Sequence, residues 1–396
     1  MQILSDSIAP QLGNASMIRQ MFEKGNELKK RFGAENVFDF SLGNPDLPPP
    51  PAAKAALHAI ADTLGEPRAL GYCSNSGWMP FRESLAKKLA VEQETPALRA
   101  EHILVSCGAA GAITSFFRAV LNPGDEVLVP SPYFVEYGSY CGHFGGILKP
   151  IPSKKPSFDI DLDAFEKAIG PKTRVILVNS PNNPTGIVYS EKTIQALGDL
   201  IAKANEGRER PIFLVSDEPY RFLAYDGAKV PAILPRSPFA VVLGSFSKSL
   251  SMAGERVGYL AANPAMPDVD KLIAAVTITT RTLGFVNAPI IGQKLANAII
   301  DSGVDLDIYA DRRRKMAAVL DGAGLSYAMP QGAFYVFPAV PGGDDVAFVE
   351  KLLEQNILAV PGRGFGCPGY IRISFSVETD TIVRSAEGFK RATGRA

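Results

Sequence analysis

The sequence is poor in the residues on which metal-dependent and histidine-dependent enzymes rely. It contains three histidines, His58, His102 and His143, and four cysteines among 396 residues. Neither set shows a metal-binding or paired-cysteine spacing. We therefore expect no metal site and no disulfide framework, and a histidine general base has few candidates.

Net charge and long apolar runs are also absent. Lys+Arg and Asp+Glu each number 41, so the chain has no positive excess for nucleic acid or an anionic membrane surface. No apolar stretch reaches the ~18–20 residues needed to span a bilayer. The first residues lack the basic and apolar regions of a secretory signal. We expect a cytoplasmic protein without nucleic-acid or membrane partners.

Short apolar strands alternate with helical patterns through the middle of the chain. Strands are predicted at 102–106, 126–130, 174–180, 211–219 and 239–248. Continuous apolar strands separated by helices are typical of an α/β fold, with a mostly parallel sheet covered by helices on both faces. In such folds, ligands bind beyond the carboxyl ends of the strands.

The two ends of the chain follow other patterns. An amphipathic helix is predicted from Ser16 to Phe32, before the stiff proline run at 48–51. After about residue 290 the sequence indicates a smaller mixture of helices and strands, including 332–338 and 370–376. We therefore expect an N-terminal arm, a large domain, and a small α+β domain that packs with the arm. Their predicted bounds are 1–47, 48–290 and 291–396.

Polar residues follow two of the predicted strands. Asp217 and Glu218 end an apolar run, where a strand that simply reaches water is the plainer interpretation. Ser245 and Lys248 come after Gly244, where the apolar part of the next strand ends, and Arg256 comes eight residues after the lysine. Hydroxyls and an arginine suit a phosphate dianion, and a neighbouring lysine can hold an aldehyde cofactor as an imine. A polar loop capped by serine remains the alternative.

Two further loops are weaker signals by themselves. The turn Cys107–Gly111 has small residues before a predicted helix, which suits phosphate binding by backbone N–H groups. It matches neither the dinucleotide fingerprint nor a Walker loop. The segment 179–186, NSPNNPTG, places asparagines at another strand end, where an ordinary turn is equally compatible.

Taken in order, these motifs resemble those of the class I/II aminotransferases, which are fold-type I pyridoxal-phosphate enzymes. The resemblance runs from SLGNPD (41–46) to YIRISFS (370–376). It implies pyridoxal 5'-phosphate as cofactor, amino-acid and 2-oxo-acid substrates, and a homodimer with shared active sites.

The resemblance also implies contacts to the cofactor ring. Asp217 would keep the ring nitrogen protonated, as an electron sink requires. Tyr220 and Asn183 would bind the phenolic oxygen. Phe134 would stack on the ring, with the neighbouring Tyr133 as an alternative.

The cofactor phosphate would lie between several donors. Ala109 and Ala110 match positions where many relatives carry a hydroxyl, so here only their backbone N–H groups are available. Ser245 and Arg256 would then bear more of the phosphate binding. Tyr72 resembles a tyrosine that reaches the phosphate of the neighbouring subunit.

The remaining implied roles concern catalysis and the substrate. Lys248 would carry the cofactor as a Schiff base and move the substrate's Cα proton. Arg372 would grip the α-carboxylate bidentately, with Gly43 and Asn183 beside it. Taken alone, Arg372 is also compatible with a solvent-facing strand position.

Alternatives remain for the outcome and the substrate. A C–S β-lyase would share the fold and cofactor site. A cofactor-binding regulator would need a DNA-binding domain, for which the arm is too short. Arg281 is a candidate for a distal substrate carboxylate, although a solvated loop arginine is equally compatible. The run Arg312–Arg314 is expected to form an exposed helix face.

Overall fold

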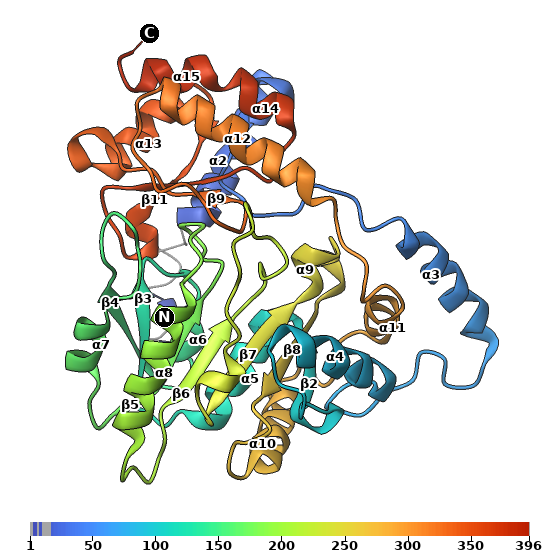
Figure 1. The fold of residues 1–396 in the computed structure, drawn as a ribbon. Coiled ribbons are helices and arrows are strands. Elements are labelled where there is room, and N and C mark those ends of the chain that lie inside the picture. Colours follow the sequence, from blue (N-terminus) through green and yellow to red (C-terminus); the bar gives the residue numbers. More distant parts are fainter. Residues whose placement is uncertain (1–2, 6–7, 10–16, 396) are drawn as a thin grey trace.

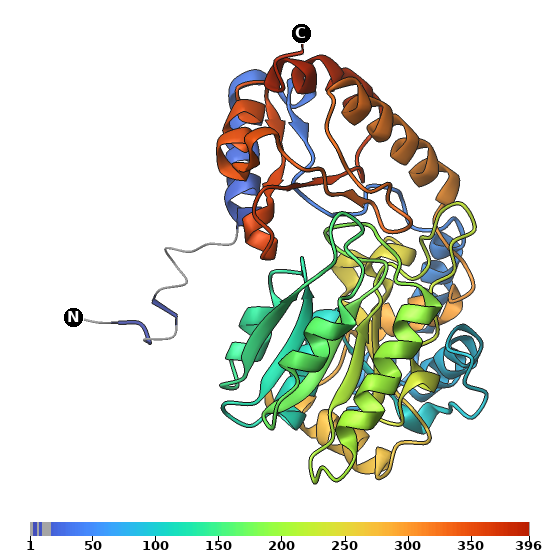
Figure 2. The same ribbon diagram turned by 60° about the vertical axis from the view of Figure 1, so that its left-hand side comes forward.

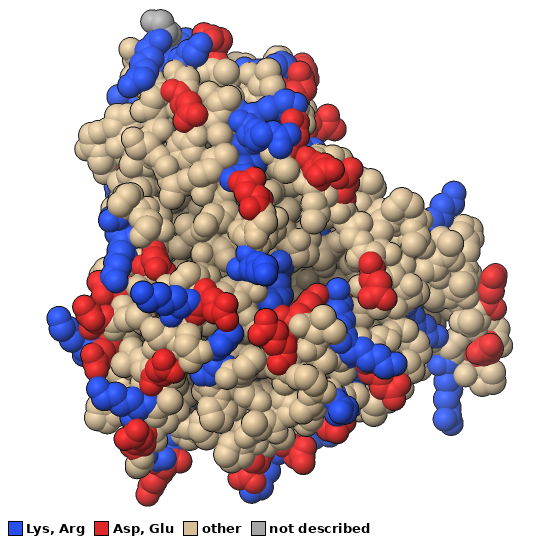
Figure 3. All heavy atoms as spheres, viewed as in Figure 1, with Lys and Arg blue, Asp and Glu red and all other residues tan. Residues whose placement is uncertain are grey.

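The computed structural model describes residues 3–5, 8–9 and 17–395. A large domain surrounds a twisted sheet, and a smaller domain lies against one end of it (Figure 1). On the face in Figure 3, acidic and basic side chains are interspersed, in keeping with the zero net charge. Within the described ranges, no helix is long and apolar enough to cross a membrane.

The sheet of the large domain has seven strands. β8 runs antiparallel to both of its neighbours, and the other adjacent pairs are parallel. The expected α/β fold with a mostly parallel sheet is therefore confirmed. From edge to edge the strands are β2 (Ile103–Cys107), β8 (Val257–Ala262), β7 (Ala240–Ser245), β6 (Phe213–Asp217), β5 (Thr173–Asn179), β3 (Glu126–Ser131) and β4 (Ile147–Pro152).

Two of these strands, β4 and β8, are not predicted from the sequence. β4 is an edge strand whose residues are mostly exposed or half-buried, and it contains Pro150 and Pro152. Prolines are tolerated at a sheet edge, and they hide the strand pattern. β8 is buried throughout, but small residues such as Gly258 and Ala261 weaken its apolar signal.

Helices cover both faces of the sheet, and strand residues alternate between the two layers. On β5, Val175 and Leu177 belong to the core with α5 and α10, whereas Ile176 and Val178 belong to the core with α4, α7 and α8. Strands buried on both faces therefore need unbroken apolar runs. The covering helices are α4 (Met79–Glu92), α5 (Gly108–Val120), α7 (Leu162–Ala168), α8 (Glu191–Asn205) and α10 (Val269–Thr282).

The small domain is built on short strands. An antiparallel sheet has the order β11–β12–β9, and a separate pair joins β1 to β10 in parallel. The short strands are β1 (Phe38–Asp39), β9 (Tyr335–Val336), β10 (Ile357–Leu358), β11 (Val360–Pro361) and β12 (Ile371–Ser374). Its helices are α12 (Leu306–Gly322), α13 (Asp345–Leu353), α14 (Thr379–Arg384) and α15 (Ala386–Ala392).

The N-terminal segment lies beside these C-terminal elements (Figure 2). The predicted helix at its start is α2 (Met17–Phe32), whereas Ser16 lies outside the described residues. Gly33 follows α2 with a φ of 86°, a conformation that glycine adopts without strain. Phe40 is fully buried among the small-domain core residues.

Helix α11 (Ile290–Ala298) packs on α3 (Ala52–Asp62), α4 and β8, which are all large-domain elements. Val304, a few residues later, belongs to the core of the small domain. We therefore propose that the domain boundary lies near Gly303 rather than near residue 290.

The expectation that Arg312–Arg314 form an exposed face is wrong for two of the three residues. Arg312 and Arg313 are only 5% and 6% exposed. Their guanidinium groups pair with Asp46 and Asp226, each at 2.7 Å. Consecutive helix residues point about 100° apart, so they reach different neighbours. Arg314 alone of the three stays exposed.

Asp46→Ala should lower the free energy of unfolding by about 2–4 kcal/mol, because it leaves the Arg312 charge buried without its partner. Urea unfolding followed by circular dichroism measures this. Asp311→Ala is the matched control, since its partners Arg314 and Lys315 lie at the surface; it should cost less than about 0.5 kcal/mol. Equal losses in both variants would contradict the assignment.

Candidate active site

Polar side chains surround a cavity of about 350 Å³ at the carboxyl ends of the parallel strands, facing the small domain. Every predicted site residue lines it, apart from Tyr72 and the candidates Arg281 and Tyr133. The residues brought together are Gly43, Ala109, Ala110, Phe134, Asn183, Asp217, Tyr220, Ser245, Lys248, Arg256 and Arg372.

One end of the cavity is suited to a dianion. Helix α5 begins at Gly108, so the N–H groups of its first turn, which includes both predicted alanines, lack intrahelical partners. The Arg256 guanidinium lies so close that a Cβ on Gly108 would be 2.5 Å from Nη2. Arg256 Nη1 is 3.5 Å from Ser247 Oγ, which accepts a 2.7 Å hydrogen bond from Ser245 Oγ. A helix N-terminus, a guanidinium and two hydroxyls together favour a phosphate.

The opposite wall carries Asp217, the last residue of β6. Its Oδ2 accepts a 2.5 Å hydrogen bond from the Tyr137 hydroxyl, and its main-chain oxygen accepts one from the Asn179 side chain. Oδ1 is buried and has no hydrogen-bond partner in the described part of the chain. Burial raises the pKa of Asp217 to about 6. This carboxylate therefore has one oxygen available for a donor that enters the cavity.

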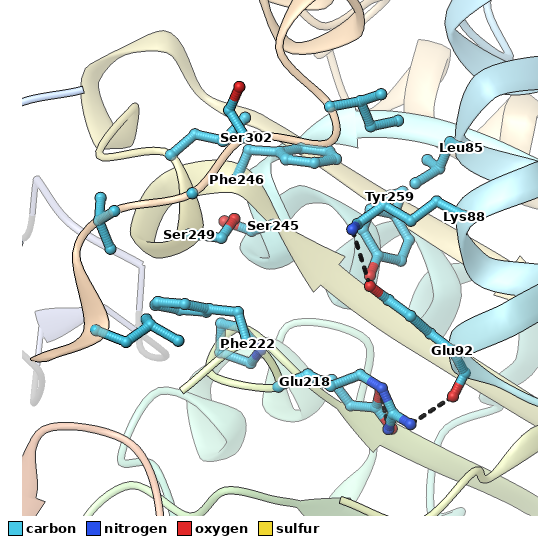
Figure 4. Close-up of a pocket in the computed structure, with 17 residues that line it drawn as sticks. Leu85, Lys88, Glu92, Glu218, Phe222, Ser245, Phe246, Ser249, Tyr259 and Ser302 are labelled. Atoms are coloured by element: carbon cyan, nitrogen blue, oxygen red, sulfur yellow. Dashed lines mark hydrogen bonds and ion pairs between the residues drawn. The ribbon is translucent and has the colours of Figure 1, made fainter. Parts of the chain in front are cut away.

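Glu218 points away from that cavity. Its carboxylate accepts hydrogen bonds from Gln93, Ser216 and Arg221. It lines a second cavity of about 150 Å³, together with Lys88 and Tyr259 (Figure 4). The partners of Glu218 are supplied within the fold, so of the two adjacent carboxylates only Asp217 faces the site.

Lys248 lies between the two ends. Its Nζ donates a 2.6 Å hydrogen bond to the main-chain oxygen of Gly43. Burial lowers the pKa of Lys248 to about 8, and the cations Arg256 and Arg372 contribute further to the lowering. The amine is thus more readily neutral, and more nucleophilic, than an ordinary lysine.

Arg372 on β12 is only 2% exposed. Nη1 donates to Asn183 Oδ1 at 3.2 Å and Nη2 donates to the main-chain oxygen of Ser41, whereas Nε has no partner among the residues that the structure describes. Its guanidinium carbon lies 4.8 Å from the ring centre of Tyr335 and 4.9 Å from that of Phe365. None of the ion pairs found among the described residues gives it a carboxylate. A buried cation without a counter-ion is costly, and an anionic ligand would remove that cost.

Aromatic side chains complete the cavity. Phe134 lines it and packs edge-on against Tyr137, with ring centres 5.4 Å apart. Tyr133 does not line it, so the geometry favours Phe134 over Tyr133 as the stacking residue. The Tyr220 hydroxyl lies 2.8 Å from the Tyr335 hydroxyl.

Two predicted groups lie outside the cavity. Tyr72 is 94% exposed. Arg281 is in the last turn of α10, is also exposed, and does not line the cavity. Neither contributes to the site within a single chain.

Several lining residues are missing from the predicted set: Tyr137, Tyr140, Asn179, Ser247 and Tyr335. Asn179 begins the segment NSPNNPTG, and Ser247 lies between the predicted Ser245 and Lys248, so position in a motif was the available signal. The tyrosines carry no local signal, because their partners are distant in the chain. Across the described ranges, no group of three or more His, Cys, Asp or Glu side chains is arranged to hold a metal ion.

Comparison with known proteins identifies the family. Residues 35–389 match the family described as aminotransferase class I and II. The chain belongs to this family and is an aminotransferase.

Related proteins cover nearly the whole chain. A probable aspartate/prephenate aminotransferase of Aquifex aeolicus (strain VF5) is 32% identical over 384 residues, which cover 93% of each chain. An aspartate aminotransferase of Thermotoga maritima is 32% identical over 89% of this chain and 90% of its own. These names favour amino transfer over the β-lyase alternative.

Solved structures agree. An aminotransferase from Eubacterium rectale matches with a TM-score of 0.95 and 36% identity, covering 100% of this chain and 99% of the other. The aspartate aminotransferase of Thermus thermophilus with maleate matches with a TM-score of 0.86 and 27% identity, covering 99% and 100%.

The depressed pKa of Lys248 predicts how this amine reacts with pH. On cofactor-free protein, labelling of Lys248 by a small amine-reactive reagent should rise roughly 10-fold from pH 7 to pH 9 and then level off, since only the neutral amine reacts. An ordinary lysine would keep rising above pH 9. Peptide mass spectrometry measures the rate at this residue. In Arg372→Leu the midpoint should move to higher pH, because a neighbouring cation is lost; an unchanged midpoint would argue against the proximity effect.

Proposed function

We propose that this aminotransferase uses pyridoxal 5'-phosphate, held covalently through Lys248 as a Schiff base. The observation that carries the proposal is that three incompletely balanced groups face one cavity: the Lys248 amine, Asp217 Oδ1 and the Arg372 guanidinium. The aldehyde of this cofactor would react with the Lys248 amine, and its protonated ring nitrogen would donate to Asp217 Oδ1. Its phosphate would bind at the end of the cavity near Arg256.

When bound, this cofactor supplies an electron sink for the electrons of the substrate's Cα–H bond. Asp217 would keep the ring nitrogen protonated, because a charged partner favours the protonated form. Tyr220 and Asn183 would hold the phenolic oxygen, and Phe134 would fix the ring plane.

The other contacts would hold the phosphate and move the proton. Ala109 and Ala110 would offer backbone N–H groups to the phosphate, beside Ser245 and Arg256. Lys248, once released by the incoming amino group, would carry the Cα proton as a general base, and no histidine lines the cavity to compete for that role.

Substrate recognition would begin at Arg372. Both the amino donor and the oxo-acid acceptor carry an α-carboxylate, so one arginine serves both halves of the reaction. Asn183 accepts a hydrogen bond from its guanidinium, and Gly43 lines the same cavity. The relatives named above are called aspartate or aspartate/prephenate aminotransferases, which favours a dicarboxylic donor such as aspartate. We propose 2-oxoglutarate as the acceptor.

A distal carboxylate would need a further cation. The cations that line the cavity are Lys248, Arg256 and Arg372, and each already has a role. We therefore propose a homodimer in which exposed residues complete the neighbouring site. Tyr72 would reach the partner's phosphate, and Arg281 is a candidate for the distal carboxylate. A cytoplasmic location remains a prediction.

Borohydride reduction followed by peptide mass spectrometry tests the covalent link. The reduced cofactor should be found on Lys248. The rate of Lys248→Ala should fall by more than ~10³-fold, as expected for a combined nucleophile and proton carrier. Lys88→Ala, which alters a lysine at the second cavity, should keep both the label and the activity. Finding the reduced cofactor on another lysine would contradict the proposal.

Arg372→Lys should raise KM for donor and acceptor alike, because the charge remains while the planar fork is lost. Losing a charge-assisted bidentate contact costs ~2–4 kcal/mol, or roughly 30- to 1,000-fold in kcat/KM. Cofactor affinity should barely change. Arg256→Lys is the matched variant, and it should weaken cofactor binding more than it raises KM for the substrates. The reverse pattern would exchange the two assignments.

A further inference from the structure

Tyr335 contacts three parts of the site at once. Its hydroxyl lies 2.8 Å from that of Tyr220, and the two rings meet edge to face at 5.5 Å and 86°. Its ring faces the Arg372 guanidinium at 4.8 Å. Both tyrosines are buried. Tyr335 belongs to β9 of the small domain and Tyr220 follows β6 of the large domain, so this hydrogen bond joins the domains.

The third contact explains why residue 43 is a glycine. A Cβ on Gly43 would lie 1.8 Å from the Tyr335 hydroxyl oxygen. Any side chain at this position would therefore push Tyr335 away from Tyr220. The same glycine accepts the hydrogen bond of Lys248 through its main-chain oxygen. Tyr335 is thus packed against the residue whose main-chain oxygen binds the reactive amine.

The proposed function determines the direction of the hydrogen bond between the tyrosines. Each hydroxyl has one proton to donate. If Tyr220 donates to the cofactor's phenolic oxygen, then Tyr335 has to donate to Tyr220. A hydroxyl that accepts a hydrogen bond becomes a stronger donor itself.

We propose that Tyr335 is a positioning residue that orients the Tyr220 hydroxyl and strengthens its hydrogen bond to the cofactor. This inference rests on the proposed function. The charged and titratable groups around the pair are Arg372, Asp217, Tyr137 and Lys248. Arg372 acts to lower the pKa of Tyr335, against the larger effect of burial, and so supports Tyr335 as a donor.

Tyr335→Phe in the holoenzyme removes the hydroxyl and keeps the ring against Arg372. The visible absorbance of the bound cofactor reports the titration of its Schiff base with Lys248. The midpoint of this titration should rise by roughly 0.3–0.7 pH unit, because a weaker hydrogen bond from Tyr220 stabilises the deprotonated form less. Tyr309→Phe is the matched control, since Tyr309 packs on Phe334 in the same core. It should leave the titration unchanged.

A double-mutant cycle separates this role from a structural one. Tyr220→Phe should shift the titration further than Tyr335→Phe does. On the Tyr220→Phe background, Tyr335→Phe should add less than about 0.1 unit, because the Tyr335 hydroxyl then has no Tyr220 hydroxyl to donate to. A shift that persists on that background, or no shift in Tyr335→Phe alone, would overturn the inference.

The two proposals fail differently. Without a cofactor chromophore on Lys248 in the wild type, the proposed function fails. If the wild type shows the titration and Tyr335→Phe has the same midpoint, the proposed function stands and only the role of Tyr335 is wrong. Thermal unfolding of each variant checks that the fold is retained. If Tyr335→Phe does not fold, Gly43→Ala displaces the hydroxyl from the other side and should also raise the titration midpoint.

Discussion

The register of the central strands determines where the polar groups of the cavity lie. Asn179 pairs with Asp217 across β5 and β6, and Ser245 pairs with Gly258 across β7 and β8. Side chains alternate between the two faces of a strand, so a slip of one residue in β6 would exchange Asp217 for its neighbour Glu218. The slip is prevented because it would also exchange the residues that face the two apolar cores.

The site concentrates charge that the fold itself does not balance. Arg372 is buried without a carboxylate among the described residues, Asp217 keeps one buried oxygen free, and Lys248 lies between two cations. Such groups cost free energy, which the large apolar cores offset. The phosphate and ring N–H of the proposed cofactor, together with the carboxylate of a substrate, would balance them, so binding and stability should be linked.

Local motifs accounted for much of the cavity lining. Asp217 and Lys248 lie at the ends of predicted strands and Asn183 comes shortly after another, and parallel strands bring their carboxyl ends to one edge. Tyr137 and Tyr335 could not be found in this way, because their partners lie 80 and 115 residues away in the chain. For the same reason the burial of Arg312 and Arg313 was missed: Asp46 and Asp226 belong to distant segments.

The sequence by itself determined five of the seven strands described for the sheet, because unbroken apolar runs such as 175–178 have to be buried on both faces. It also determined which polar residues end these strands. Only the tertiary structure decided what those residues are free to do. Glu218 is satisfied by Gln93 and Arg221, whereas the adjacent Asp217 keeps an oxygen open to the cavity. Burial and hydrogen bonding decide this difference, and both arise from segments that meet only when the chain is folded.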